Sequence, residues 1–141
     1  MTKVMAATLK GAALDWTVAT IEALPIRHDP MAFGNTANGG YWIWAEEYPP
    51  KLGYLKIGLD YSPSTIWSQG GPLIDSMDGF QLKNWLESNP ETKCEAHIHN
   101  YEGDWIAFGP TPLIAAMRCL VKAKLGDEVD VPEELLPQQT H

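Results

Sequence analysis

The chain has 141 residues, of which 45% are hydrophobic and 20% charged, and a formal net charge of −8 at pH 7. This length and composition indicate one folded domain, residues 1–141, and exclude a largely disordered chain. Lys and Arg total only 10, which disfavours a nucleic-acid surface because such surfaces need clustered basic side chains.

The N-terminal residues lack a basic start followed by a long apolar stretch and a cleavage site, which is the pattern of a signal peptide. No apolar run approaches the roughly 18 residues that a membrane span requires. We therefore expect a cytoplasmic location. The two cysteines, Cys94 and Cys119, are too few to hold a fold by disulfides and are expected to be small buried hydrophobic residues.

The first predicted elements are a short strand or extended arm at residues 4–8 and a helix that Thr8 caps and that ends after Leu24, before a proline. This helix has one apolar stripe, formed by Leu14, Val18 and Ile21. Asp15 falls outside the stripe and is expected to face water. The pattern is typical of a surface helix with one buried side.

A long loop is predicted at residues 25–40, which are rich in proline, glycine and asparagine. Residues 41–46 and 54–59 are aromatic and β-branched and are predicted to be two paired strands. Within residues 61–74, the Gly-Gly-Pro sequence at 70–72 is expected to redirect the chain sharply, after which a short strand or buried segment begins.

Residues 80–87 are predicted to form one or two helical turns. Three of their side chains are expected to point inward: Leu82, Trp85 and Leu86. Residues 93–101 alternate between apolar and polar side chains, as a strand with one buried face does. Its polar side carries Glu95, His97 and His99. The chain then turns, and residues 105–108 are predicted to return as the partner strand.

Residues 109–126 carry the clearest helix pattern. Thr111 offers a capping oxygen, Pro112 suits the first helical position, and Gly126 suits the left-handed conformation that ends a helix. The apolar positions spread over more than half of the circumference, so we expect this to be the central helix of the core. An acidic tail, residues 127–141, follows. The order of elements predicts an α+β fold, a small antiparallel sheet with two main helices packed on one face.

His97 and His99 are the sharpest candidates for chemistry. Residues two apart in a strand point to the same side, so both imidazoles can reach one metal ion, with an oxygen from Glu95, Glu102 or Asp104. The other interpretation is a plain polar outer face of an antiparallel hairpin. Because the pattern leaves the third ligand unspecified, we predict neither a metal nor another cofactor.

Aromatic side chains are dense between residues 41 and 67, and exposed aromatic patches rimmed by polar groups mark interaction surfaces. The alternative is that these rings only fill the core. A stretch held by glycine and proline presents its side chains well, so the middle stretch is the predicted contact surface. Its candidate binding residues are Tyr61, Ser64, Thr65, Trp67 and Gln69.

Three blocks carry a family resemblance: TLKGAALDWTVAT, YSPSTIWSQGGPLI and GPTPLIAAMRCLVKAKLGDEVDVPEEL. They resemble, in this order, the small NinX-type proteins of tailed bacteriophages and prophages. The resemblance implies a phage or prophage origin and expression in the cytoplasm of a bacterial host, and it brings no activity, cofactor or catalytic residue with it. The family commonly has an acidic residue where this chain has Ile66, so any role of that carboxylate is absent here.

These observations favour a non-enzymatic phage accessory protein that binds an unidentified phage or host protein. The acidic composition, the clustered aromatics and the lack of a converging catalytic set in the sequence support this hypothesis. The alternative is a metal-dependent small enzyme or ligand binder that uses the His97/His99 hairpin. A homodimer formed through an aromatic strand edge also stays open.

Overall fold

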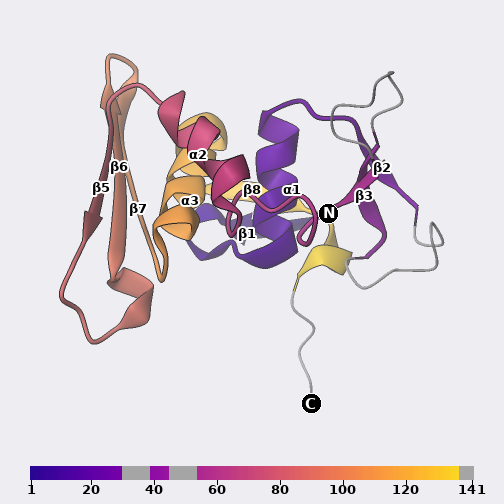
Figure 1. Cartoon of the computed structure of the whole chain (residues 1–141), viewed down its shortest axis with the longest axis horizontal. Helices are drawn as coiled ribbons and strands as arrows, with labels where there is room; N and C mark the ends of the chain where they lie inside the picture. Colours follow the sequence, from indigo (N-terminus) through magenta and orange to yellow (C-terminus); the bar gives the residue numbers. More distant parts are fainter. Residues whose placement is uncertain (30–38, 45–53, 137–141) are drawn as a thin grey trace.

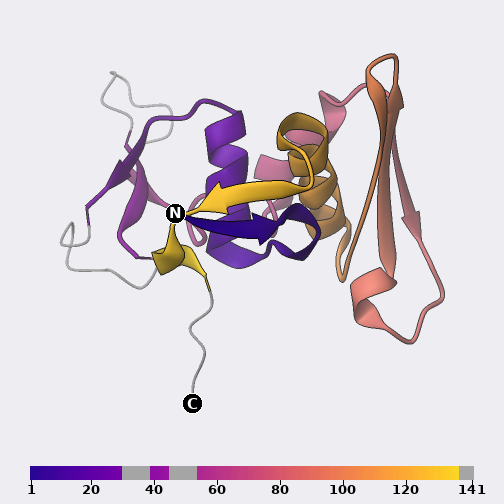
Figure 2. The same ribbon diagram turned by 180° about the vertical axis from the view of Figure 1, so that it is seen from behind.

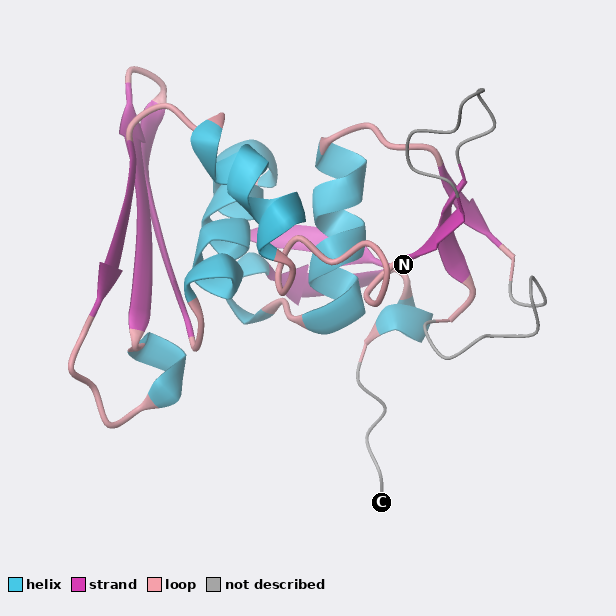
Figure 3. Ribbon diagram, in the orientation of Figure 1, coloured by secondary structure: helices cyan, strands magenta, loops and turns pink. Residues whose placement is uncertain are grey.

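The computed structural model describes residues 1–29, 39–44 and 54–136 (Figure 1). The α-helices in these ranges are α1 (Gly11–Ile21), α2 (Trp67–Asp75) and α3 (Pro112–Leu125). The strands are β1 (Thr2–Met5), β2 (Ile26–His28), β3 (Tyr41–Trp44), β4 (Tyr54–Lys56), β5 (Phe80–Asn84), β6 (Cys94–Asn100), β7 (Gly103–Gly109) and β8 (Glu128–Val131). Figure 3 shows the helices grouped between strands at either end of the molecule, which confirms the α+β class.

The helix α3 is the central element of the core, as its sequence predicts. Its first turn is capped by Thr111, whose side-chain oxygen accepts a hydrogen bond from the Ile114 amide at 3.2 Å, and it ends at Gly126, whose φ is 96°. On one side α3 packs on β6 and β7, and on the other it packs on α1 (Figure 1). Met117 and Val121 of its buried face have no exposed surface.

The strands pair antiparallel and divide among three small sheets, whereas the sequence predicts one. Their orders are β1-β8, β2-β3-β4 and β5-β6-β7. Figure 2 shows β1 and β8 lying side by side in front of the helices, although they come from opposite ends of the chain. Val129 and Val131 of β8 are buried in the same cluster as α1 and α3, so this part of the predicted acidic tail belongs to the core.

A buried arginine on α3 ties the N-terminal segment to the β6–β7 hairpin. The Arg118 side chain is 4% exposed, and its Nε donates to the Leu9 carbonyl at 2.7 Å. Its Nη1 donates to the Phe108 carbonyl at 2.9 Å and to the Glu91 carboxylate at 3.3 Å. These carbonyls and one carboxylate satisfy a charge that would be costly to bury alone.

The helix α1 is shorter than predicted, and Thr8 does not cap it. Residues 6–8 form a 3-10 turn, in which the Thr8 hydroxyl donates to the Met5 carbonyl, and the helix begins only at Gly11. Leu9 is buried and extended, which leaves its carbonyl free to accept from Arg118. The tertiary contact therefore decides where the helix starts.

The predicted loop 25–40 contains a strand, which corrects that expectation. β2 pairs with β3 in the register Ile26↔Ile43, and the His28 ring stacks on Tyr41 with centroids 4.1 Å apart. The pairing of β3 with β4 confirms the predicted hairpin strands, while the link between them and residues 30–38 lie outside the described part of the chain. A three-residue strand has too little periodicity to be recognised without its partner.

The Gly-Gly-Pro sequence lies inside α2 and does not redirect the chain, so that prediction is wrong. The helix begins at Trp67 and includes the residues expected to start a strand. At Gly70 a Cβ atom would collide with the Pro63 carbonyl oxygen, so this glycine permits the preceding turn to pack directly on the helix. Pro72 lacks only the amide that would bond the Ser68 carbonyl.

The predicted helical turns at residues 80–87 are wrong as well, because residues 80–84 form the edge strand β5. Its register with β6 runs from Phe80↔Ile98 to Asn84↔Cys94. The three side chains predicted to point inward are instead exposed, at 39%, 42% and 106% for Leu82, Trp85 and Leu86. The helix α3 covers mainly β6 and β7, which leaves this edge open to water.

Candidate functional site

The outer face of the β6–β7 hairpin brings His97, His99 and Asp104 together. The inward residues of β6, among them Ala96 and Ile98, are buried against α3, which confirms the predicted alternation and turns both imidazoles outward. Asp104 lies opposite His99 in the strand register. One ligand atom from each of the three side chains lies within 4.8 Å of the other two.

A single carboxylate oxygen joins the two rings. Asp104 Oδ1 accepts a hydrogen bond from His97 Nε2 and another from His99 Nδ1, the latter at 3.1 Å. The hydrogen bond from His97, followed by the one from His99, lowers the pKa of Asp104 below its ordinary value of 3.8. The sequence leaves Glu95, Glu102 and Asp104 as candidates for the third ligand, and the structure places Asp104 in the cluster.

A second polar arrangement is buried where α1 meets the turn before α2. Asp15, expected to face water, is 0% exposed. Its Oδ2 accepts from the Ser62 hydroxyl at 2.7 Å, and its Oδ1 accepts from the Ser64 amide at 3.0 Å. The helix α1 is covered beyond its apolar stripe because this turn packs on it, and the stripe alone gives no sign of that second contact.

Burial controls the protonation of this junction. It raises the pKa of Asp15 above its ordinary value of 3.8, and the hydrogen bonds from Ser62 and Ser64 only partly oppose the rise. Burial also raises the pKa of Tyr61, with smaller contributions from the Glu22 and Asp15 carboxylates. Desolvation of a charged oxygen is the common cause.

The five predicted binding residues all belong to this junction, but they differ in exposure. Tyr61 and Ser64 are buried, at 6% and 1% exposed. Gln69 is half-buried and spans the turn: its Oε1 accepts from the Ser62 amide at 2.5 Å, and its Nε2 donates to the Asp60 carbonyl at 2.7 Å. Thr65 and Trp67 are exposed, the latter at 55%.

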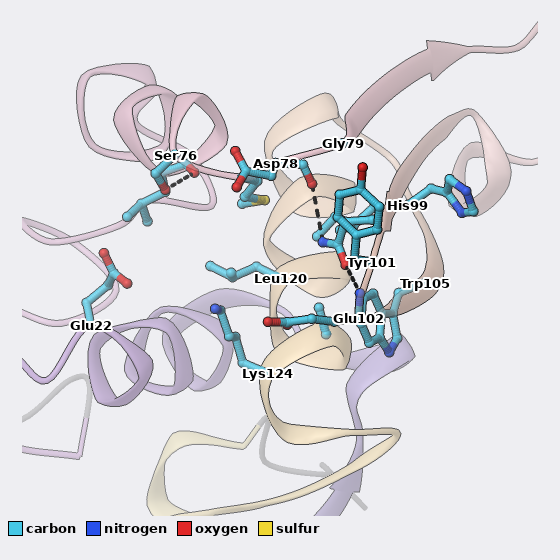
Figure 4. Close-up of a pocket in the computed structure, with 15 residues that line it drawn as sticks. Glu22, Ser76, Asp78, Gly79, His99, Tyr101, Glu102, Trp105, Leu120 and Lys124 are labelled. Atoms are coloured by element: carbon cyan, nitrogen blue, oxygen red, sulfur yellow. Dashed lines mark hydrogen bonds between the residues drawn. The ribbon is translucent and has the colours of Figure 1, made fainter.

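A cavity of about 740 Å³ lies between the end of α2, the β6–β7 turn and α3 (Figure 4). Its apolar wall includes Trp105 and Leu120, and its polar lining includes Glu22, the residue after α1, and Lys124 of α3. His99 is among the residues that line this cavity, although its ring points away from the cavity in Figure 4. The sequence gives no sign of this cavity, because its walls come from segments far apart in the chain.

The fold and these features define a small acidic α+β protein with a buried polar junction and an exposed imidazole–carboxylate cluster. A family described as Bacteriophage P22, NinX matches residues 5–124. The chain therefore belongs to this family of phage accessory proteins, as its sequence blocks indicate. None of the curated proteins matches it. In the described part of the chain, no helix has the length and apolar character needed to cross a bilayer.

Proposed function

We propose that this phage accessory protein is not an enzyme and acts by binding another protein, through the segment from Tyr61 to Gln69. In this proposal Thr65 and Trp67 make the contact. The less exposed Tyr61, Ser64 and Gln69 hold the segment against the rest of the fold. The observation that carries the proposal is the exposed Trp67 ring on a rigidly anchored helix start.

The anchoring supports this function because a binding surface gains affinity when it is already ordered before the partner arrives. Two hydrogen bonds reach from Asp15 to the turn, and Gln69 closes the same turn from the side of α2. Trp67 is the first residue of α2, two positions before Gln69, and is 55% exposed. Tryptophan is among the residues that contribute most to binding energy at protein interfaces.

Charge indicates the chemistry of the partner. Residues 57–82 contain three aspartates and neither lysine nor arginine, within a chain of net charge −8. Asp60 and Asp75 of this stretch are exposed. A partner with an apolar pocket for Trp67 and a basic rim matches this surface, since complementary charge speeds association and selects against wrong partners.

The experiment uses the full chain as bait for affinity capture from the lysate of a bacterial host that carries a phage encoding a protein of this family. Three baits are compared by quantitative mass spectrometry. The baits are the wild type, Trp67→Ala, and the matched control Trp85→Ala, which removes a tryptophan of similar exposure (42%) from the β5 end of the molecule. We expect one protein that the wild type and Trp85→Ala retain and that Trp67→Ala loses. Its capture should weaken as salt rises.

The other outcomes contradict the proposal. A capture profile that is the same for Trp67→Ala and the wild type removes Trp67 from the interface. Loss with Trp85→Ala instead moves the surface to the β5–β6–β7 sheet. If light scattering finds a wild-type dimer that Trp67→Ala dissociates, the segment binds a second copy of the chain, and the proposed phage or host partner is wrong.

A further inference from the structure

The outer face of the β6–β7 hairpin carries three side chains whose nitrogen and oxygen atoms converge on one point. His97 and His99 present different ring nitrogens, Nε2 and Nδ1, toward the same point. Asp104 approaches that point from the neighbouring strand. Two nitrogens and one oxygen thus converge from two strands of one hairpin.

The backbone beneath these side chains is fixed, which favours a defined site. Ala96 and Ile98 alternate with the two histidines and are buried against α3. At the end of the hairpin, the Asn100 side chain accepts from the Glu102 amide at 2.8 Å and closes the turn that leads to Asp104. The three ligands therefore need only rotations of their side chains to meet an ion.

The distances suit a first-row transition metal. Such ions bind histidine nitrogen and carboxylate oxygen at about 2.0–2.2 Å, so ligand atoms around one ion lie about 3–3.5 Å apart. The ligand atoms here lie within 4.8 Å of one another. An ion would replace the two ring protons that now bond to Asp104 and would bind all three groups at once.

We propose that His97, His99 and Asp104 bind a divalent transition-metal ion, with Zn²⁺ as its representative. Imidazole nitrogen together with carboxylate oxygen suits zinc and its neighbours, whereas magnesium and calcium prefer sites made of oxygen alone. The side chains are 26%, 72% and 55% exposed, respectively, so the remaining coordination positions face solvent. Three protein ligands with an open position are the arrangement in which a zinc ion keeps a bound water.

The test is isothermal titration calorimetry of the full, metal-stripped chain with Zn²⁺, and with Mg²⁺ for comparison. We expect one saturable zinc site per chain and no heat of binding with magnesium. Asp104→Asn and His99→Gln should each weaken zinc binding by at least about tenfold, because the first replaces a charged carboxylate oxygen by a neutral amide oxygen and the second removes an imidazole nitrogen. Circular dichroism of each variant verifies that it is folded.

Matched controls separate this site from general affinity of the chain for zinc. His28→Gln and His141→Gln remove the histidines outside the cluster, and Glu102→Gln removes a nearby carboxylate that is not part of it. All three should bind zinc as the wild type does. Co²⁺ gives a second readout, because its visible absorption reports nitrogen and oxygen ligation directly.

Two results would overturn the metal site. One is the absence of saturable binding at zinc concentrations of several hundred micromolar. The other is zinc binding that persists in His97→Gln and His99→Gln or that disappears in a control variant. The proposal is independent of the protein-binding function: Trp67→Ala should keep the zinc site, and His99→Gln should keep the captured partner.

Discussion

Asp15 and Asp104 each bond to two neighbouring residues, yet they lie in opposite environments. Asp15 is enclosed between α1 and the turn before α2, with no exposed surface, while the Asp104 side chain is 55% exposed on the hairpin. Burial raises the pKa of the first, and hydrogen bonds from two histidines lower the pKa of the second. Buried contacts therefore shape the fold, whereas the exposed ones leave atoms available for a ligand.

The largest expected effect comes from the close packing at the buried junction. Gly70→Ala places a Cβ atom against the Pro63 carbonyl oxygen and the Leu113 side chain, and backbone cannot move aside cheaply. We expect the free energy of unfolding to fall by about 2–3 kcal/mol. Urea denaturation followed by circular dichroism measures it.

Its matched control is the next residue, Gly71, where an added Cβ meets nothing within 4 Å. Gly71→Ala lies in the same helix and should raise the free energy of unfolding by about 0.5–1 kcal/mol, because alanine favours helix more than glycine does. Equal effects of the two substitutions would show that Gly70 matters for helix propensity and that the approach to Pro63 does not.

The next effect compares the two aspartates directly. Asp15→Ala removes the buried carboxylate that accepts hydrogen bonds from the Ser62 hydroxyl and the Ser64 amide. We therefore expect the free energy of unfolding to fall by about 2 kcal/mol. Asp104→Ala removes only exposed bonds and should lower the midpoint of denaturation far less than Asp15→Ala does. A loss of stability as large in Asp104→Ala as in Asp15→Ala would contradict the distinction drawn between the two regions.

The sequence predicts those elements whose pattern is local. The cap at Thr111, the end of the helix at Gly126, and the alternation that places His97 and His99 outward all depend on residues close together in the chain, and each is confirmed. Cys94 and Cys119 are buried free thiols, as expected. Helical periodicity and strand alternation are sufficient for such elements.

The sequence does not predict features that depend on contacts between residues far apart in the chain. The burial of Asp15 depends on residues 62–64, and the start of α1 depends on the hydrogen bond that Arg118 donates to the Leu9 carbonyl. The helix α2 tolerates two glycines because one of them packs against a preceding turn. None of these contacts has a signature in one stretch of sequence. The third member of the histidine cluster was likewise one of three candidates until the strand register selected Asp104.

The smallest effect, and the sharpest comparison, is the pH dependence of stability. Between its ordinary pKa of 3.8 and its raised folded pKa, Asp15 holds more protons in the folded state than in the unfolded state, so its contribution to stability falls as pH rises. Asp104, with a lowered folded pKa, holds fewer protons when folded, so its contribution is present above pH 3.8 and is lost as pH falls through the folded pKa.

Replacement by asparagine isolates these two contributions while retaining an oxygen acceptor at each position. We expect the free energy of unfolding of the wild type, relative to that of Asp15→Asn, to decrease as pH rises above 3.8. Relative to that of Asp104→Asn, the free energy of unfolding of the wild type should increase with pH in the acid range up to 3.8. The second slope should be the shallower, because solvent screens an exposed pair. Denaturation midpoints measured from pH 3 to pH 7 give both slopes. Slopes of the same sign would mean that burial does not govern Asp15, because only desolvation outweighing the two serine bonds makes the signs opposite.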